Sequence, residues 1–251
     1  MADLQKVYQY VDEHGEEMVA ELQRLVRQPS VSSSGEGVPE CADLLVEIMR
    51  DAGIDARKVE TEGQPIVFGE VRADNPDAPT LLHYSHYDVQ PGDADDPLWD
   101  APPFEAKRFG DRIVGRGTTD AKGNVMAFVQ AVKAMKAAGD VPINLKFMFD
   151  GEEESGSPSM PGFVEANRDL LAADAVLGFD GGFGAGDTPN IGLGNSGLLT
   201  CQLRAKGGEK DLPSARARLV PNPAWKMVWA LSSMKGPDNR VLIEGFYDDV
   251  R

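Results

Sequence analysis

Short apolar runs alternate with segments of helical periodicity, and this alternation constrains the fold more than any other feature of the chain. The clearest helix is predicted at Ala121–Ala138, where Val125, Val129 and Val132 recur on one face. A strand is predicted directly after it, at Ile143–Phe149. Strands that alternate with helices in this way favour an α/β fold whose sheet is covered by helices on both faces.

The other predicted elements follow from the same patterns. Helices are predicted at Tyr8–Arg27, Glu40–Ala52, Pro161–Ala172 and Pro223–Met234, and strands at Ile66–Val71, Thr80–Tyr84, Arg112–Val114, Ala175–Phe179 and Leu198–Lys206. The pattern changes after Gly181 and Gly182, and a boundary is expected within residues 192–197. We therefore expect one α/β domain over residues 1–193 and the beginning of a smaller α+β domain over residues 194–251.

The charge balance limits the partners of this chain. With 25 Lys and Arg against 41 Asp and Glu, the net charge is −16, which argues against nucleic acids and anionic membranes because both repel an acidic surface. No apolar run approaches the roughly 20 residues of a membrane span, and no signal-peptide core is present, so we expect a soluble, cytoplasmic protein. Cys41 and Cys201 match no metal or disulfide spacing and are expected to be buried, reduced thiols.

A histidine and an aspartate end the apolar run of Leu81–Asp88. Residues two apart on a strand point to the same face, so the His86 imidazole and the Asp88 carboxylate can touch. A carboxylate beside a metal-bound histidine fixes its tautomer, whereas a chance acidic neighbour is the alternative in so acidic a chain. His83 and His14 are expected to be structural residues.

A glycine-rich turn, Gly115–Gly123, connects a predicted strand to the clearest helix and contains Asp120. This aspartate is placed either to cap the helix N-terminus or to bind a ligand, and the residues alone leave both interpretations open. The glycines would let the backbone approach another group closely. The turn lacks the spacing of lysine and glycine that defines a Walker phosphate loop.

Two more predicted strands end in acids. The run Glu152–Glu154 follows one of them and Asp180 follows the other, at the strand ends where α/β sheets present ligand sites, although a run of acids is more often a solvated loop. Because adjacent residues point in opposite directions, Glu153 and Glu154 can divide the roles of base and ligand. Four strand ends that deliver histidine or carboxylate indicate a pair of zinc ions, which can activate water while a free glutamate takes the proton.

With these residues in place, the chain resembles the M20 family of zinc metallopeptidases, and within it the dipeptidase branch most closely. The most specific matches are the blocks His86–Pro91 and Gly115–Gly123. The segments Arg27–Ser32 and Val220–Trp225 extend the resemblance over nearly the whole chain. The resemblance implies a hydrolase that cleaves the amide bond of dipeptides or N-acyl amino acids.

The resemblance also implies a set of metal ligands. His86 and Asp180 would bind one zinc ion and Glu154 the other, and Asp120 would bridge the two, with a cis peptide bond after it. The cofactor would be two Zn²⁺ per site, with Mn²⁺ or Co²⁺ as substitutes. The second position is expected to be incomplete, because the family takes a further histidine there and the sequence contains no histidine after His86.

Two residues would have catalytic roles in a protein of this family. Asp88 would orient His86, and Glu153 would act as the general base and acid. By the same resemblance, Arg116, Lys122 and Asp150 are expected to support the site structurally.

The resemblance further implies a zinc-exopeptidase-like mixed sheet flanked by helices, with part of a lid and dimerisation domain after it. The lid histidine of the family lies in a block that reads Asp211–Ala215 here, with Pro213 in its place. We expect a C-terminally truncated chain that forms a homodimer through the lid in its longer form. Trp225, Trp229 and Phe246 would be left without cover, which favours self-association.

Three hypotheses for the function remain open at this point. The first is a metal-dependent peptidase or amidase that acts on small peptides or N-acyl amino acids. The second is a catalytically impaired metal-binding fragment of such an enzyme. The third, a purely structural α/β module, would bind no metal and leaves the acids at four strand ends unexplained.

Overall fold

Residues 4–178 contain two N-terminal helices, then five strands in succession, and only after these do helices and strands alternate as the hydrophobic pattern predicts. A computed structural model describes residues 3–182, 188, 191–194, 197–208, 210, 213–216 and 218–250. The chain divides into two compact units, residues 1–190 and residues 191–251, and each unit is described by itself.

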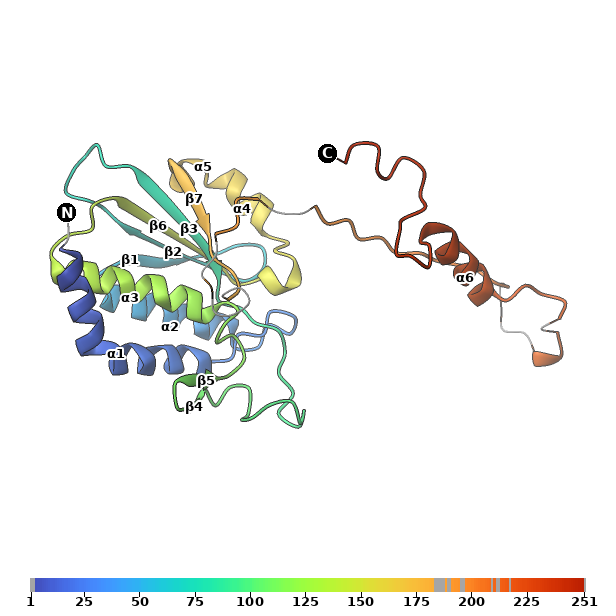
Figure 1. The fold of residues 1–251 in the computed structure, drawn as a ribbon, viewed down its shortest axis with the longest axis horizontal. Coiled ribbons are helices and arrows are strands. Elements are labelled where there is room, and N and C mark those ends of the chain that lie inside the picture. The colour runs from blue at the N-terminus through green and yellow to red at the C-terminus, as the bar shows by residue number, and fades with distance from the viewer. Residues whose placement is uncertain are drawn as a thin grey trace. The chain divides into compact units, whose positions relative to one another are not determined.

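A five-stranded mixed sheet forms the centre of the first unit (Figure 1). Its order is β1-β2-β6-β3-β7, with bounds Asp55–Val59, Ile66–Val71, Asn144–Asp150, Thr80–His86 and Ala175–Gly178. Strand β3 runs parallel to both β6 and β7, whereas β2 is antiparallel to both of its neighbours, β1 and β6. The register pairs His86 with Asp150 and Tyr84 with Gly178, so the carboxyl ends of three parallel strands meet at one edge.

Helices cover both faces of this sheet, which confirms the α/β prediction (Figure 1). One face carries α1 (Leu4–Arg27), α2 (Val38–Asp51) and α3 (Lys122–Ala138). The other face carries α4 (Met160–Ala166) and α5 (Arg168–Leu171). A separate two-stranded sheet is formed by β4 (Lys107–Phe109) and β5 (Arg112–Val114).

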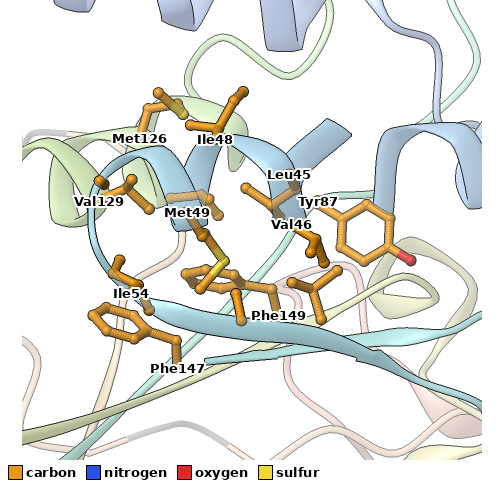
Figure 2. Close-up of a cluster of buried hydrophobic side chains, with 14 of the residues drawn as sticks. Leu45, Val46, Ile48, Met49, Ile54, Tyr87, Met126, Val129, Phe147 and Phe149 are labelled. Carbon is orange, nitrogen blue, oxygen red and sulfur yellow. The ribbon is translucent and has the colours of Figure 1, made fainter. Parts of the chain in front are cut away.

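The side chains of β6 alternate between two hydrophobic clusters. Phe147 and Phe149 pack beneath Leu45 and Met49 of α2 (Figure 2), and Met148 points to the opposite cluster under α4. Fully burying a side chain of this kind contributes roughly 1.5–3 kcal/mol relative to leaving it exposed. The packing of both faces fixes β6, and β6 in turn fixes its neighbour β3.

Three predictions for the first unit need correction. Strands β1 and β4 were not predicted, because neither has a clear apolar alternation. The helix predicted at Pro161–Ala172 is two short helices, since the backbone at Asn167 leaves the helical conformation and its side-chain amide donates to the Phe163 carbonyl.

The second unit contains α6, Pro223–Met234, and a short 3-10 turn, Ser214–Arg216. The Asn222 side chain accepts the Ala224 N–H and caps α6, whose Trp225 and Trp229 rings stack at 6.3 Å with both side chains exposed. The predicted strand Leu198–Lys206 is wrong, because no strand among the described residues pairs with it.

The structure also tests the prediction that both cysteines are buried. Cys41 in the first unit is buried as predicted, whereas Cys201 in the second unit is exposed, since no strand is found around it among the described residues. Within the block Asp211–Ala215, the first two residues lie outside the described residues, and Pro213 precedes the 3-10 turn.

No helix in the described part of the chain is long and apolar enough to cross a membrane.

Candidate metal centre

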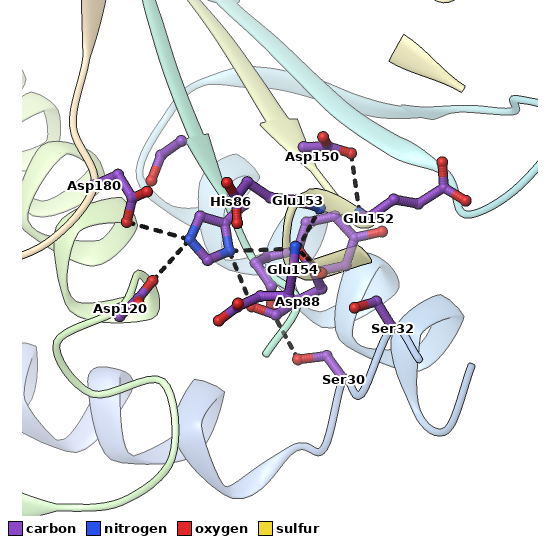
Figure 3. A network of polar contacts seen from close by, with 12 residues as sticks. Ser30, Ser32, His86, Asp88, Asp120, Asp150, Glu152, Glu153, Glu154 and Asp180 are labelled. Atoms are coloured by element: carbon purple, nitrogen blue, oxygen red, sulfur yellow. Dashed lines mark hydrogen bonds and ion pairs between the residues drawn. The ribbon is translucent and has the colours of Figure 1, made fainter. Parts of the chain in front are cut away.

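The carboxyl edge of the three parallel strands gathers the predicted site residues (Figure 3). His86 is the last residue of β3, Asp150 ends β6, and Asp180 lies two residues after β7. The short 3-10 turn Glu153–Ser155 follows β6, and Asp120 lies two residues before α3. Parallel pairing therefore explains why residues far apart in the sequence meet here.

His86 is fully buried and oriented by Asp88. Its Nδ1 lies 3.0 Å from the Asp88 carbonyl oxygen and 3.3 Å from Asp88 Oδ1. Nδ1–H therefore donates to Asp88, and in the neutral ring Nε2 carries the lone pair that can bind a cation. Nε2 faces two carboxylates, at 2.9 Å from Asp120 Oδ1 and 3.4 Å from Asp180 Oδ1.

These three side chains form a donor set suited to a divalent cation. His86, Asp120 and Asp180 each offer one ligand atom, and the three atoms lie within 4.8 Å of one another. Zinc binds histidine nitrogen and carboxylate oxygen at about 2.0–2.2 Å, so two ligands of one ion lie at most about 4.4 Å apart. The distances of 2.9 Å and 3.4 Å from His86 Nε2 to the two carboxylates lie inside this limit. Nitrogen and carboxylate ligands also suit other divalent transition metals, and the chemistry of the donors therefore fits a metal without selecting one.

The electrostatics of the site favour an added positive charge. Burial lowers the pKa of His86, but the hydrogen bond and charge of Asp88, together with the charge of Asp180, raise it to about 10. Burial raises the pKa of Asp120, and the neighbouring Asp180 carboxylate raises it further. Such mutual repulsion between carboxylates is relieved when a dication binds between them.

Asp120 belongs to the candidate donor set and does not cap α3. The N-cap position of α3 is Ala121, and no side chain caps the helix there, so the capping interpretation is wrong. The peptide bond between Asp120 and Ala121 is cis, as the family resemblance implied. In the same turn, a Cβ on Gly123 would lie 2.1 Å from the Thr118 carbonyl oxygen, which explains why only glycine fits.

Asp88 also holds the turn that carries the glutamates. Its Oδ1 accepts the Glu153 N–H at 3.2 Å, and its Oδ2 accepts the Glu154 N–H at 3.1 Å. Burial raises the pKa of Glu153, with further increases from Asp180 and Glu154 that oppose the lowering effect of His86. Glu154 is not in the set of three ligand atoms, but its charge reaches Asp120 and raises the pKa of that carboxyl.

The residues expected to have structural roles make structural contacts. Lys122 is fully buried, and its Nζ donates to the carbonyls of Leu25 and Gln28 at the end of α1. Asp150 accepts the Ser157 hydroxyl at 2.6 Å and the Glu152 N–H at 3.0 Å. The Arg116 guanidinium lies over the Trp99 ring.

Both other histidines also serve the fold. His83 is buried with its Nδ1 3.2 Å from the Leu177 carbonyl oxygen, and its ring stacks on Phe128 at 3.8 Å. The His14 ring stacks on Tyr10 within α1. These contacts agree with the structural roles expected of both residues.

Sequence reasoning missed two residues around the glutamate turn. The buried Glu152 carboxylate accepts the N–H groups of Gln64 and Ser159, so the first glutamate of the run anchors the loop between β1 and β2. Gln90 donates to Glu154. Nothing in the sequence distinguishes Glu152 from its two glutamate neighbours. For Gln90, the available signal was its position two residues after Asp88, in the segment that carries His86 and Asp88.

Comparison with known proteins identifies relatives along nearly the whole chain. The Cys-Gly metallodipeptidase dug1 of Schizosaccharomyces pombe is 32% identical over 265 residues, which cover 98% of this chain and 55% of that protein. The Beta-Ala-His dipeptidase of Homo sapiens is 30% identical over 269 residues, which cover 98% of this chain and 52% of that protein. The chain thus spans about half the length of the curated relatives it matches.

Solved structures and a family model agree with this relationship. The M20 family metallo-carboxypeptidase Sso-CP2 from Sulfolobus solfataricus matches with a TM-score of 0.80 and 37% identity, covering 94% of this chain and 53% of that chain. Residues 82–235, which make up more than half of the chain, match the model described as Peptidase family M20/M25/M40. The chain therefore belongs to peptidase family M20/M25/M40.

Proposed function

We propose that the chain is part of a metal-dependent hydrolase that cleaves the amide bond of dipeptides or N-acyl amino acids with a water activated by two zinc ions. The observation that carries this proposal is the convergence of His86, Asp120 and Asp180 at the carboxyl edge of the sheet, with ligand atoms within 4.8 Å of one another. Membership of a peptidase family supports the reaction class.

Each ligand has a place in the proposed site. His86 and Asp180 would hold one ion, Asp120 would be shared with the second, and Glu154 would complete the protein ligands that this chain offers there. Two divalent ions, when bound, polarise a scissile carbonyl and lower the pKa of a water molecule. Mn²⁺ or Co²⁺ can substitute where zinc is scarce, because the donors are nitrogen and carboxylate oxygen.

Glu153 is the proposed general base and acid. Its carboxylate follows β6 at the same edge as His86, and Asp88 holds the backbone of its turn. A carboxyl whose pKa is raised by burial retains a proton more readily, which suits a group that takes a proton from water and returns it to a leaving amine. Asp88 meanwhile keeps the His86 ring in the orientation that points Nε2 at the ligand set.

The proposed substrates are small, and the two units have different proposed roles. The relatives are a Cys-Gly metallodipeptidase and a Beta-Ala-His dipeptidase, which supports dipeptides as substrates for this chain. We assign catalysis to residues 1–193, and part of a lid and homodimer interface to residues 194–251. The net charge of −16 argues against nucleic acids and anionic membranes as partners.

A panel of dipeptides and N-acyl amino acids tests the proposal. The protein is loaded with Zn²⁺, Mn²⁺ or Co²⁺, and the release of free amino acid is measured for wild type, E153Q and the control E17Q, which changes an exposed glutamate of α1. We expect hydrolysis by wild type and E17Q, and a loss of about 10²–10⁴-fold in kcat for E153Q with metal content unchanged. Absence of turnover with two metals bound per chain would contradict the proposed reaction.

A further inference from the structure

An exposed glutamine beside the metal centre binds Glu154 through two contacts. Gln90 lies two residues after Asp88, and its Nε2 donates to the Glu154 carbonyl oxygen at 2.9 Å and to Glu154 Oε2 at 3.1 Å. One amide group therefore contacts both the backbone and the side chain of the same residue. Asp88 accepts the Glu154 N–H from the same short segment, so residues 88 and 90 together make three hydrogen bonds to this glutamate.

The glutamate needs such support because its own element is short. Glu154 lies in a three-residue 3-10 turn, which cannot fix a side chain with three rotatable bonds. Ordering a free glutamate side chain costs up to about 1.5–2 kcal/mol of conformational entropy. A contact that orders the carboxylate beforehand removes that cost from cation binding.

The chemistry of an amide suits this task. An ionised carboxylate has about four lone-pair sites, so Glu154 can accept from Gln90 and still offer oxygen to a cation. A lysine or arginine in the same position would compete with the cation for the negative charge. Glutamine is neutral, so it orients the carboxylate and leaves its charge available.

We propose that Gln90 is a positioning residue for Glu154, which sets the carboxylate in the orientation that binds the second metal ion. This inference rests on the proposed function, because it assigns Glu154 to that ion. Hydrogen bonds that orient metal ligands typically change metal affinity by about 10–100-fold. Loss of the Gln90 contact should therefore weaken only the metal-binding step that depends on Glu154.

Zinc titration of the metal-free protein tests the proposal directly. Stepwise Zn²⁺ affinities are measured by calorimetry with a competing chelator for wild type, E154Q, Q90A, Q90L and the double variant Q90A/E154Q. The control is Q9A, because Gln9 is an exposed glutamine that donates to a glutamate, Glu13, on α1. Circular dichroism checks that every variant is folded.

The expected result has three parts. E154Q weakens one zinc-binding step, and Q90A and Q90L weaken that same step by about 10–100-fold while the other step changes by less than about twofold. Q90A adds nothing in the E154Q background, because the group that it orients is already gone. Q9A behaves like wild type.

Different failures overturn different claims. If E154Q weakens a step and both Gln90 variants match wild type, the inference is wrong and the proposed function stands. If Q90A weakens binding equally with and without E154Q, Gln90 acts through another residue and the inference is again wrong. If E154Q alters no step, Glu154 binds no metal, which overturns the proposed second position and the inference together.

Discussion

A buried histidine in the strand that leads to the metal centre makes stability depend on pH. His83 stacks on Phe128, and the rings of Phe147 and Phe149 meet it edge-on. Burial lowers the pKa of His83 to about 4, despite the opposing effect of its hydrogen bond with the Leu177 carbonyl. The folded protein therefore favours the neutral ring.

The sign and size of the effect follow from this pKa. Because the unfolded chain has a histidine pKa of about 6.5, it takes up the proton first as the pH falls, and stability is lost between about pH 6.5 and pH 4. The full difference of about 2.5 units corresponds to roughly 3 kcal/mol, of which about 2 kcal/mol is already lost at pH 5. Above pH 7 His83 is neutral in both the folded and the unfolded state, so none of this stability is lost.

Replacing His83 with phenylalanine should remove this pH dependence. H83F keeps the aromatic packing but loses the hydrogen bond to Leu177, which should cost about 1 kcal/mol at pH 8. At pH 5 the variant should be more stable than wild type by about 1 kcal/mol, because it has no proton to bind. Urea unfolding of metal-free protein at pH 8, 7, 6 and 5 measures the crossing.

A matched control separates titration from packing. F163L removes packing on the opposite face of the sheet without changing a titratable group, so its stability loss should be the same at every pH. If H83F and wild type lose equal stability between pH 8 and pH 5, the burial argument for His83 is refuted.

Three further predictions concern the core and the site. Leu45→Ala removes a fully buried side chain from the cluster that contains Phe147 and Phe149 of β6, and it should lower the free energy of unfolding by about 2–5 kcal/mol, measured with urea. A loss below about 1 kcal/mol would contradict the packing. Gly123→Ala places a Cβ 2.1 Å from the Thr118 carbonyl oxygen, so it should weaken zinc binding as well as lower the melting temperature, and unchanged zinc affinity would show that the turn does not set the site. Asp180→Asn removes the charge of a proposed ligand while keeping the shape of its side chain, and calorimetry should show at least about tenfold weaker zinc binding. Wild-type affinity would exclude Asp180 from the proposed ligands.

Much of the first unit could be predicted from hydrophobic periodicity. The helix expected at Ala121–Ala138 is α3 almost to the residue, and the strand expected at Ile143–Phe149 is β6 shifted by one residue. These segments are long and strongly patterned, and their burial agrees with the pattern. In contrast, β1 has only one fully buried residue, Ala56, and its pairing with β2 depends on the rest of the sheet.

Some of the candidate site residues could likewise be predicted from the local sequence pattern, whereas the roles of others became clear only from the tertiary structure. Polar residues at the ends of apolar strands indicated His86 and Asp180, since strand ends meet at one edge when the strands are parallel, and the glycine-rich turn before α3 indicated Asp120. The choice between cap and ligand at Asp120 required the actual helix start. The division of labour within Glu152–Glu154 depended on which carboxylate reaches the loop between β1 and β2, and no sequence spacing encodes that contact.

The central claim is that His86, Asp120 and Asp180 bind a divalent metal ion at the carboxyl edge of the sheet. A crystal structure of the zinc-loaded protein, with anomalous diffraction recorded on both sides of the zinc absorption edge, tests it most directly. We expect an anomalous peak about 2.0–2.2 Å from His86 Nε2 and from one carboxylate oxygen each of Asp120 and Asp180. A fully loaded crystal with no peak there, or with zinc bound only elsewhere, would contradict the claim.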